Sequence, residues 1–292
     1  MTILITGVKG FVGSYLSSRL SKKHKIIGVD KKNGKLQDLR NINNSFFNGL
    51  AKKKIDMIIH LAANAQVRDS VKDPGLAREN IEIDCNILEF ARKNNIKKII
   101  FSSSREVYGN QAIKNYKETD SKTWFTGTPY SAGKVNMESL LSAYKICYGI
   151  KYVIIRLSNV FGLNDPNYRF IPILFDNIPK NKTVCIFGKE KQMDFTYIDD
   201  CVDAIEIVVN KFEILSKQDI PIYNIACAKS TKLIDIAKYI KKQLKSKSKI
   251  EATKSYLGEV VYYQANINKF KNLTGWEPKI TIYQGINKMI EK

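Results

Sequence analysis

The 292-residue chain contains little histidine and no closely spaced cysteines. Its two histidines, His24 and His60, lie far apart, and none of its five cysteines forms a CxxC pair. These scarcities argue against a zinc site and against a disulfide framework, and they predict free thiols in a reducing compartment. We therefore expect no metal, and we interpret both histidines as structural.

The sequence also lacks an evident leader and a membrane span. Its first seven residues, MTILITG, enter a β-rich run at once, without the charged and apolar regions of a signal peptide. No apolar run reaches the roughly 20 residues that a transmembrane helix needs. We expect a cytoplasmic protein with no membrane insertion.

Acidic residues are scarce relative to basic ones. The 28 Asp and Glu against 48 Lys and Arg give a formal net charge of +20. Such a charge is compatible with binding nucleic acid, a membrane surface or an anionic small molecule. Most lysines are scattered, with one dense cluster at 244–255, and lysine far outnumbers arginine, which indicates compositional bias. We expect no nucleic-acid partner, although an anionic substrate would benefit from the field.

Short β-rich runs alternate with longer amphipathic patterns along most of the chain. The helical patterns lie at 12–22, 78–94 and 131–147, between several of the β-rich runs. This order predicts an α/β fold with a doubly wound parallel (Rossmann) sheet. Strands are expected at 3–6, 25–30, 57–62, 97–103, 151–157, 183–188 and 221–226.

The last third of the chain is less regular and predicts a smaller α/β substrate lobe, interleaved with the main sheet. We expect a dinucleotide-binding Rossmann domain of residues 1–158 plus about 196–227. The substrate-binding lobe would comprise about 159–195 and 228–292.

A glycine-rich turn follows the first expected strand. In ILITGVKGFVGSYL, Gly7 permits a tight turn, Gly10 lets the backbone approach a pyrophosphate, and Gly13 lets the following helix pack closely. That helix, with Phe11 and Val12 at its start, would direct its N-terminus at the phosphates. The turn therefore predicts a dinucleotide site.

Asp30 ends the second expected strand, about where a carboxylate meets the adenosine ribose in dinucleotide-binding folds. A carboxylate repels a 2′-phosphate, so Asp30 favours NAD. Lys31 and Lys32 follow directly and could pair with such a phosphate, which leaves NADP as the alternative.

The segment TPYSAGK places Tyr130 and Lys134 four residues apart. On a helix this spacing puts both side chains on one face, where the lysine charge favours the phenolate form of the tyrosine. Such a tyrosine can exchange a proton with a sugar hydroxyl while a nicotinamide exchanges a hydride with the same carbon. The pair is therefore a candidate catalytic pair.

These motifs, in this order, resemble those of the extended short-chain dehydrogenase/reductase family, in particular its NAD-dependent nucleotide-sugar epimerases and dehydratases. The similarity covers nearly the whole chain. The matching segments are TGVKGFVG (6–13), HLAA (60–63), FSSSREVYG (101–109), YSAGK (130–134), RLSNVFG (156–162), MDFTYIDD (193–200) and GWEP (275–278).

The resemblance implies roles for several residues. Ser104 would hydrogen-bond the reacting hydroxyl or carbonyl, beside Tyr130 and Lys134. Ser102 would lie near the nicotinamide, and Asn159 would meet the substrate diphosphate. Beyond the glycine turn, the expected cofactor contacts are Asp30, Lys31, the adenine pair Asp38 and Leu39, then Leu61, Ala62, Ala63, Asn80, Ser102, Tyr130 and Lys134.

Departures from the family pattern bear on the reaction. This chain resembles the sugar 4,6-dehydratases, which carry an Asp-Glu pair just before VYG. At the same two positions it has Arg105 and Glu106. The acid that would protonate the departing hydroxyl is absent, which argues against dehydration. Glu106 remains a candidate catalytic base, and its alternative reading is a surface or helix-capping carboxylate.

The arginines that bind the substrate diphosphate in many family members are also missing. One is expected where Met193 stands, and another near Tyr256. Lysine offers a point charge instead of a bidentate fork, so it replaces arginine imperfectly. The candidate replacements are Lys189, Lys191 and the lysines within 245–254.

Together the motifs predict an NAD-dependent nucleotide-sugar 4-epimerase that acts through a transient 4-keto sugar, with Tyr130 as acid/base. The first alternative is an NAD(P)H-dependent 4-keto-6-deoxysugar reductase, followed by a dehydratase or decarboxylase. A non-catalytic sensor or scaffold is a further alternative, against which the intact Ser104, Tyr130 and Lys134 set argues. The usual setting of such enzymes is the supply of precursors for cell-surface polysaccharides.

The resemblance also implies a homodimer with a four-helix interface. The helix before the SSS strand and the helix after YSAGK would form it. Core packing against the sheet would explain the same apolar residues equally well; they are Ile81, Ile87, Leu88, Leu140, Leu141 and Tyr144.

Overall fold

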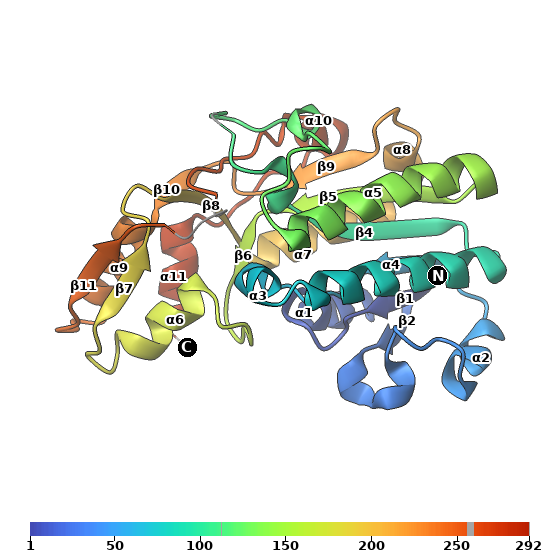
Figure 1. Ribbon diagram of the computed structural model, residues 1–292, viewed down its shortest axis with the longest axis horizontal. Helices are drawn as coiled ribbons and strands as arrows, with labels where there is room; N and C mark the ends of the chain where they lie inside the picture. The colour runs from blue at the N-terminus through green and yellow to red at the C-terminus, as the bar shows by residue number, and fades with distance from the viewer. Residues whose placement is uncertain (112, 256–259, 292) are drawn as a thin grey trace.

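The computed structural model describes residues 1–111, 113–255 and 260–291. A six-stranded sheet forms its larger part (Figure 1). The strand order is β2-β1-β3-β4-β5-β9, and every neighbouring pair is parallel. The strands are β1 (Thr2–Thr6), β2 (Lys25–Val29), β3 (Met57–His60), β4 (Lys98–Ser104), β5 (Lys151–Leu157) and β9 (Ile222–Ile225). The doubly wound parallel sheet is confirmed.

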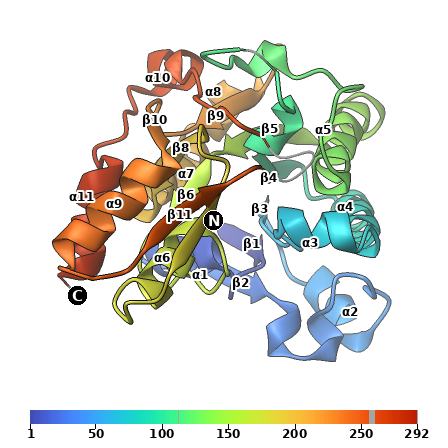
Figure 2. The ribbon, with the colours of Figure 1, turned by 60° about the vertical axis from the view of Figure 1, so that its left-hand side comes forward.

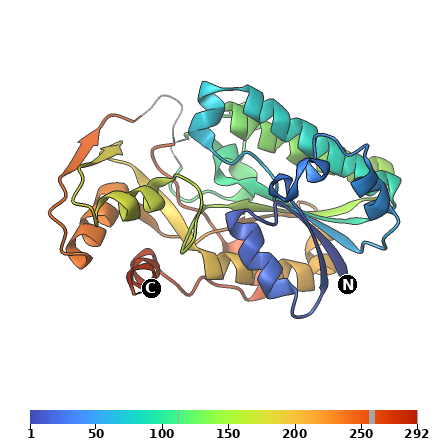
Figure 3. The same ribbon diagram turned by 90° about the horizontal axis from the view of Figure 1, so that it is seen from below.

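Side-chain alternation along these strands creates two apolar faces. In β4, Ile99 and Phe101 join one buried cluster, whereas Ile100 joins the other. Helices α4 (Gly75–Lys93) and α5 (Pro129–Tyr148) cover the first face, and α1 (Phe11–Leu20) and α7 (Ile198–Asn210) cover the second (Figure 3). Burial on both faces explains why the strands read as nearly continuous apolar runs.

The start of α5 is fixed by local sequence chemistry. Thr128 is the N-cap, and its hydroxyl accepts a hydrogen bond from the Ser131 backbone N–H at 3.3 Å. The Ser131 hydroxyl accepts in return from the Thr128 N–H at 3.0 Å. Pro129 occupies the first turn, where its missing N–H costs nothing. This capping box sets Tyr130 in the first turn of the helix.

Two further sheets build the smaller part of the molecule, which Figure 2 shows from another side. One has the order β10-β8-β6, and the other pairs β11 with β7. Their strands are β6 (Asn159–Phe161), β7 (Val184–Phe187), β8 (Gln192–Tyr197), β10 (Ser230–Lys232) and β11 (Ile250–Thr253), and the helices beside them are α6 (Phe170–Asn177), α9 (Leu233–Gln243) and α11 (Ile282–Ile290).

Shorter elements connect these parts. The remaining α-helices are α2 (Ser45–Ala51), α3 (Val67–Lys72), α8 (Phe212–Ser216) and α10 (Asn268–Thr274), and the 3-10 turns are η1 (Lys31–Asn33), η2 (Lys35–Gln37), η3 (Arg105–Tyr108) and η4 (Glu118–Asp120). One buried apolar cluster runs through both parts, from Ile3 and Ile155 in the six-stranded sheet to Ile186 and Ile240 beside the smaller sheets. The predicted domain boundaries remain a prediction.

All seven expected strands are present, although several end a residue or two before the predicted limit. Four additional strands, β6, β8, β10 and β11, were not expected. Among the described residues, no helix combines the length and apolar character needed to cross a membrane.

Candidate active site

The glycine turn lies where β1 meets α1. Gly7 has a φ of +71°, a left-handed conformation that favours glycine, and a Cβ there would lie 2.8 Å from the Ala62 backbone nitrogen. A Cβ at Gly13 would lie 2.1 Å from the Gly7 carbonyl oxygen, so only glycine allows α1 to start this close to the strand. The turn therefore has the close packing that a dinucleotide cradle requires.

The first turn of α1 presents backbone N–H groups that no N-cap side chain satisfies in the described part of the chain. Its N-cap is Gly10, which has no side chain to satisfy the first N–H groups of the helix. Phe11 and Val12 supply the first of these groups, while the Phe11 ring packs into the core. A helix N-terminus of this kind suits a pyrophosphate.

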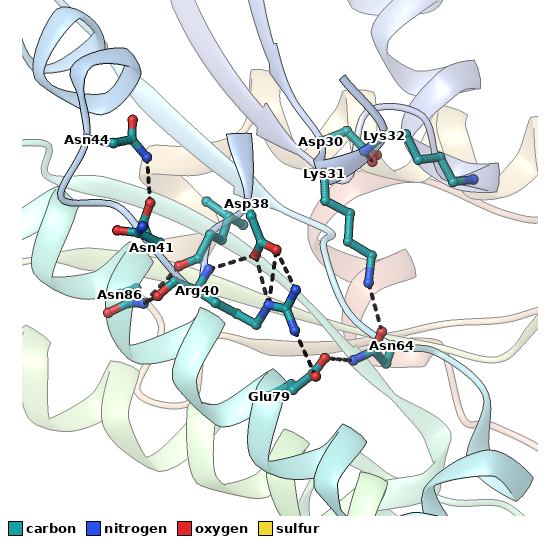
Figure 4. Close-up of polar contacts among 11 residues, drawn as sticks. Asp30, Lys31, Lys32, Asp38, Arg40, Asn41, Asn44, Asn64, Glu79 and Asn86 are labelled. Carbon is teal, nitrogen blue, oxygen red and sulfur yellow. Dashed lines mark hydrogen bonds and ion pairs between the residues drawn. The ribbon is translucent and has the colours of Figure 1, made fainter. Parts of the chain in front are cut away.

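Asp30 lies directly after β2 and borders the same turn. Its Oδ2 accepts a hydrogen bond from the Lys9 backbone N–H at 2.9 Å, and its Oδ1 accepts from the Lys32 N–H at 3.0 Å. The carboxylate is thus fixed beside the glycine turn, at the position expected for a ribose contact. Figure 4 shows the Lys31 side chain pointing away from it, with Nζ 3.4 Å from Asn64 Oδ1. The glycine cradle, the open helix N-terminus and Asp30 together fit a dinucleotide.

Of the predicted adenine pair, Asp38 and Leu39, the aspartate is held by an arginine that sequence reasoning missed. The Arg40 guanidinium donates two hydrogen bonds to the Asp38 carboxylate, from Nη2 at 2.6 Å and from Nε at 3.1 Å (Figure 4). Its Nη1 donates a third to Glu79 Oε1 at 2.8 Å. This fork lowers the pKa of Asp38. Leu39 is buried, and its carbonyl accepts a hydrogen bond from Asn86.

We expect Arg40→Met to raise the Kd for NAD by about three- to tenfold, because the Asp38 carboxylate loses the fork that orients it. Arg40 is two-fifths exposed, so the effect is that of a partly screened ion pair. Titration of cofactor-stripped protein with NAD measures it, and Lys53→Met, at an exposed lysine, is the control. Equal Kd values for both variants would contradict the prediction.

The segment after β3 is ordered by a buried histidine. His60 Nδ1 lies 2.6 Å from Thr6 Oγ1, and His60 Nε2 lies 2.8 Å from Asp84 Oδ1. Thr6 Oγ1 also accepts hydrogen bonds from the backbone N–H groups of Leu61 and Ala62. His60 is fully buried and has the structural role predicted for it. It thereby fixes the HLAA backbone beside the glycine turn, at the switch point of the sheet.

Asn80 and Asn64 tie the same segment to α4. The Asn64 backbone N–H donates to Asn80 Oδ1 at 2.7 Å, and Asn80 Nδ2 donates to the Asn64 carbonyl at 3.1 Å. Leu61, Ala62 and Ala63, the predicted cofactor contacts of this segment, are half-buried. Asn80 is nearly fully buried, and its amide fixes the backbone of the segment that follows β3.

Tyr130 and Lys134 both point inward from α5. Lys134 Nζ donates to the Ser102 carbonyl at 2.9 Å and lies 5.8 Å from the centre of the Tyr130 ring. The same ammonium lies 4.6 Å from the centre of the Phe101 ring. Both side chains are nearly buried, and the lysine is held at the end of β4. The structure therefore brings Tyr130, Lys134 and Ser102 together.

Ser104 is the last residue of β4 and caps the turn η3. Its Oγ accepts a hydrogen bond from the Glu106 backbone N–H at 3.2 Å. Arg105 Nη2 lies 2.7 Å from Glu106 Oε1, and Arg105 Nε donates to Asn159 Oδ1 at 3.2 Å. Glu106 is therefore buried and paired, and the surface reading of this residue is wrong.

Asn159 is fixed from a second side. Its Nδ2 donates to the Asp194 carbonyl at 2.9 Å. The Asp194 carboxylate is fully buried and accepts the backbone N–H groups of Cys227 at 2.9 Å and Ala265 at 3.3 Å. Burial raises the pKa of Asp194 to about 7. This aspartate connects β8 to the C-terminal segment through Ala265, and its backbone carbonyl fixes the position of Asn159.

The positions of the expected diphosphate arginines differ in environment. Met193 packs into the apolar core, and Tyr256 lies outside the described residues. Lys189 is exposed, whereas Lys191 is nearly buried. In residues 1–111, 113–255 and 260–291, no group of three or more His, Cys, Asp or Glu side chains could hold a metal ion.

Comparisons with known proteins fit this site. A family model described as the NAD dependent epimerase/dehydratase family matches residues 3–226. A putative UDP-glucose 4-epimerase of Methanocaldococcus jannaschii is 32% identical over 307 residues, which cover 99% of this chain and 97% of that protein. The dTDP-glucose 4,6-dehydratase of Shigella flexneri is 28% identical over 341 residues, with 100% and 92% covered. The crystal structure of the UDP-glucose 4-epimerase of Thermotoga maritima with UDP-glucose has a TM-score of 0.87 at 27% identity, covering 100% and 98% of the two chains.

Proposed function

Because the chain belongs to the NAD-dependent epimerase/dehydratase family, we propose that it is a nucleotide-sugar 4-epimerase. The choice of reaction rests on Arg105, the residue that directly follows β4. A dehydratase needs a proton donor for the departing hydroxyl, and a guanidinium does not release its proton in a protein. Ser104, Tyr130 and Lys134 supply what epimerisation needs without that donor.

In the proposed reaction, Tyr130 accepts the proton of the sugar 4-hydroxyl and returns it after inversion. Ser104 Oγ hydrogen-bonds the oxygen on C4 as it becomes a ketone, and Lys134 would hold the cofactor ribose. A bound NAD would supply hydride transfer at C4. Gly7, Gly10 and the start of α1 would hold its pyrophosphate, and Asp30 its adenosine ribose.

The runner-up is an NAD(P)H-dependent 4-keto-6-deoxysugar reductase. Lys31 and Lys32 are exposed beside Asp30, where they could pair with a 2′-phosphate. The two functions differ in how the cofactor is used, because an epimerase recycles it within each turnover and a reductase consumes it.

The decisive experiment is to purify the protein without added cofactor, denature it and identify the released nucleotide. We expect stoichiometric NAD. The protein should then epimerise at least one of UDP-glucose, UDP-N-acetylglucosamine and UDP-glucuronate, as followed by NMR of the anomeric and C4 protons. An empty site that binds NADPH more tightly than NADH would overturn the proposal in favour of the reductase.

We also propose a homodimer in the cytoplasm that pairs α4 and α5 of two chains. Ile87, Leu88 and Leu141 are completely buried in the core, so they are not available for an interface. Ile81, Leu140 and Tyr144 are only half-buried and remain candidates. Light scattering should give twice the 33.3 kDa chain mass, and a monomer would remove this part of the proposal.

A further inference from the structure

Two opposite charges are buried in the turn that follows Ser104. Arg105 Nη2 and Glu106 Oε1 lie 2.7 Å apart, and the two side chains are only 14% and 9% exposed. The turn η3 that carries them packs against α5, the helix of Tyr130. The pair therefore follows Ser104 directly in the chain and lies on a turn that contacts the helix of Tyr130.

The arginine is immobilised by its other contacts. Its Nε donates to Asn159, and its guanidinium carbon lies 5.7 Å from the centre of the Tyr263 ring. In the part of the chain that the structure describes, Arg105 Nη1 is buried without a hydrogen-bond partner. The Tyr263 ring offsets part of this cost, because an aromatic face attracts a guanidinium. A side chain held in this way keeps its charge beside Glu106.

The same turn ties the glutamate to Ser104. Its backbone N–H donates to the Ser104 hydroxyl, which is the group proposed to bond the oxygen on C4. Oxidation at C4 makes the neighbouring C5 proton acidic, because the ketone can accept the electron pair as an enolate. We infer that a carboxylate released from its ion pair in this turn, two residues after Ser104, is the base that could remove that proton.

We propose that Arg105 is a specificity-determining residue, which holds the Glu106 carboxylate in an ion pair and so protects C5 of the 4-keto intermediate from proton exchange. This inference rests on the proposed 4-epimerase function. The Arg105 guanidinium engages Glu106 Oε1 at 2.7 Å, so this oxygen is not free to approach C5. The enzyme then inverts C4 and leaves C5 untouched.

The suppressed step is a balanced proton transfer. Glu106 would take the C5 proton as the C5–H bond breaks, and the electron pair would form a C4–C5 double bond while the C4 oxygen becomes an enolate. Return of a proton from the carboxyl to C5 restores the ketone, so no oxidant or reductant is consumed. In D2O, each cycle in which the carboxyl proton exchanges with solvent before its return replaces hydrogen at C5 by deuterium.

Arg105→Met tests the inference, because the buried carboxylate loses the cationic partner that holds it away from C5. The protein is incubated in D2O with whichever of UDP-glucose, UDP-N-acetylglucosamine and UDP-glucuronate it epimerises, and deuterium at C5 is measured by NMR and mass spectrometry. We expect at least about a tenfold increase in C5 deuterium per turnover over the wild type. Arg105→Lys keeps the charge and should return exchange to the wild-type level.

Further arms separate the possible causes. Adding Glu106→Gln to Arg105→Met should abolish the gained exchange, which identifies Glu106 as the base. An Arg105→Met protein that epimerises without gaining C5 deuterium would overturn the inference. So would a wild-type product that already carries C5 deuterium, and this arm does not depend on any variant being stable. Failure of the wild type to epimerise any of the three nucleotide sugars would instead count against the proposed function.

Discussion

Replacing Tyr130 by phenylalanine is expected to lower kcat for epimerisation by about 10²–10⁴-fold, because the variant cannot exchange a proton with the C4 oxygen. The ring itself is 8% exposed and should keep its packing on α5. Initial rates with a nucleotide sugar that the wild type epimerises measure the loss.

Two controls make the Tyr130→Phe result specific. NAD released on denaturation should equal that from the wild type, because the glycine turn and Asp30 are unchanged. Tyr148→Phe, at an exposed tyrosine of the last turn of the same helix, should retain wild-type kcat. Full activity of Tyr130→Phe would refute the assignment of the proton exchange to this residue.

The second large effect is expected on stability. Arg156 lies within β5 with its side chain 3% exposed, and it forms a fork with Glu138 at 3.0 and 2.7 Å. Its Nη1 donates to the Glu118 carbonyl at 2.8 Å, and its guanidinium carbon lies 4.9 Å from the centre of the Tyr108 ring. Removing Arg156 leaves the Glu138 carboxylate, 9% exposed, without its cationic partner.

We expect Arg156→Met to lower the free energy of unfolding by about 3–5 kcal/mol. Urea unfolding with a two-state fit measures the change. The control is Lys151→Met at the start of the same strand, where the lysine forms an exposed pair with Glu213 and the loss should stay within about 1 kcal/mol. Similar losses of unfolding free energy for both variants would show that burial does not make the Arg156–Glu138 pair more stabilising than an exposed pair.

The parts of the fold that the sequence predicts are those with strong local signals. The β-rich runs of the main sheet are buried on both faces, and the glycine turn has a spacing that one backbone geometry requires. By contrast, β6 and β10 have three residues each and exist because both pair with β8. A strand defined by a distant partner leaves little local pattern.

In the candidate site, too, contacts within one element are predictable from the sequence, and contacts between distant elements are not. Tyr130 and Lys134 were identifiable because they share one helix, so their spacing alone puts them together. Arg40 and Glu79 are 39 positions apart, and only the folded chain reveals their contact. The pair of Arg105 and Glu106 was visible as two adjacent letters, but its burial was not, because the charged residues of a short turn are usually solvated.

The apolar cluster that runs through both parts of the molecule has a consequence for its cooperativity. Ile3 and Ile155 of the six-stranded sheet belong to one continuous core with Ile186 and Ile240 beside the smaller sheets. Neither part can expose its side of this cluster without a large loss of buried apolar area. The chain should therefore unfold in a single calorimetric transition, and a fragment that stops after β9 should fail to fold by itself.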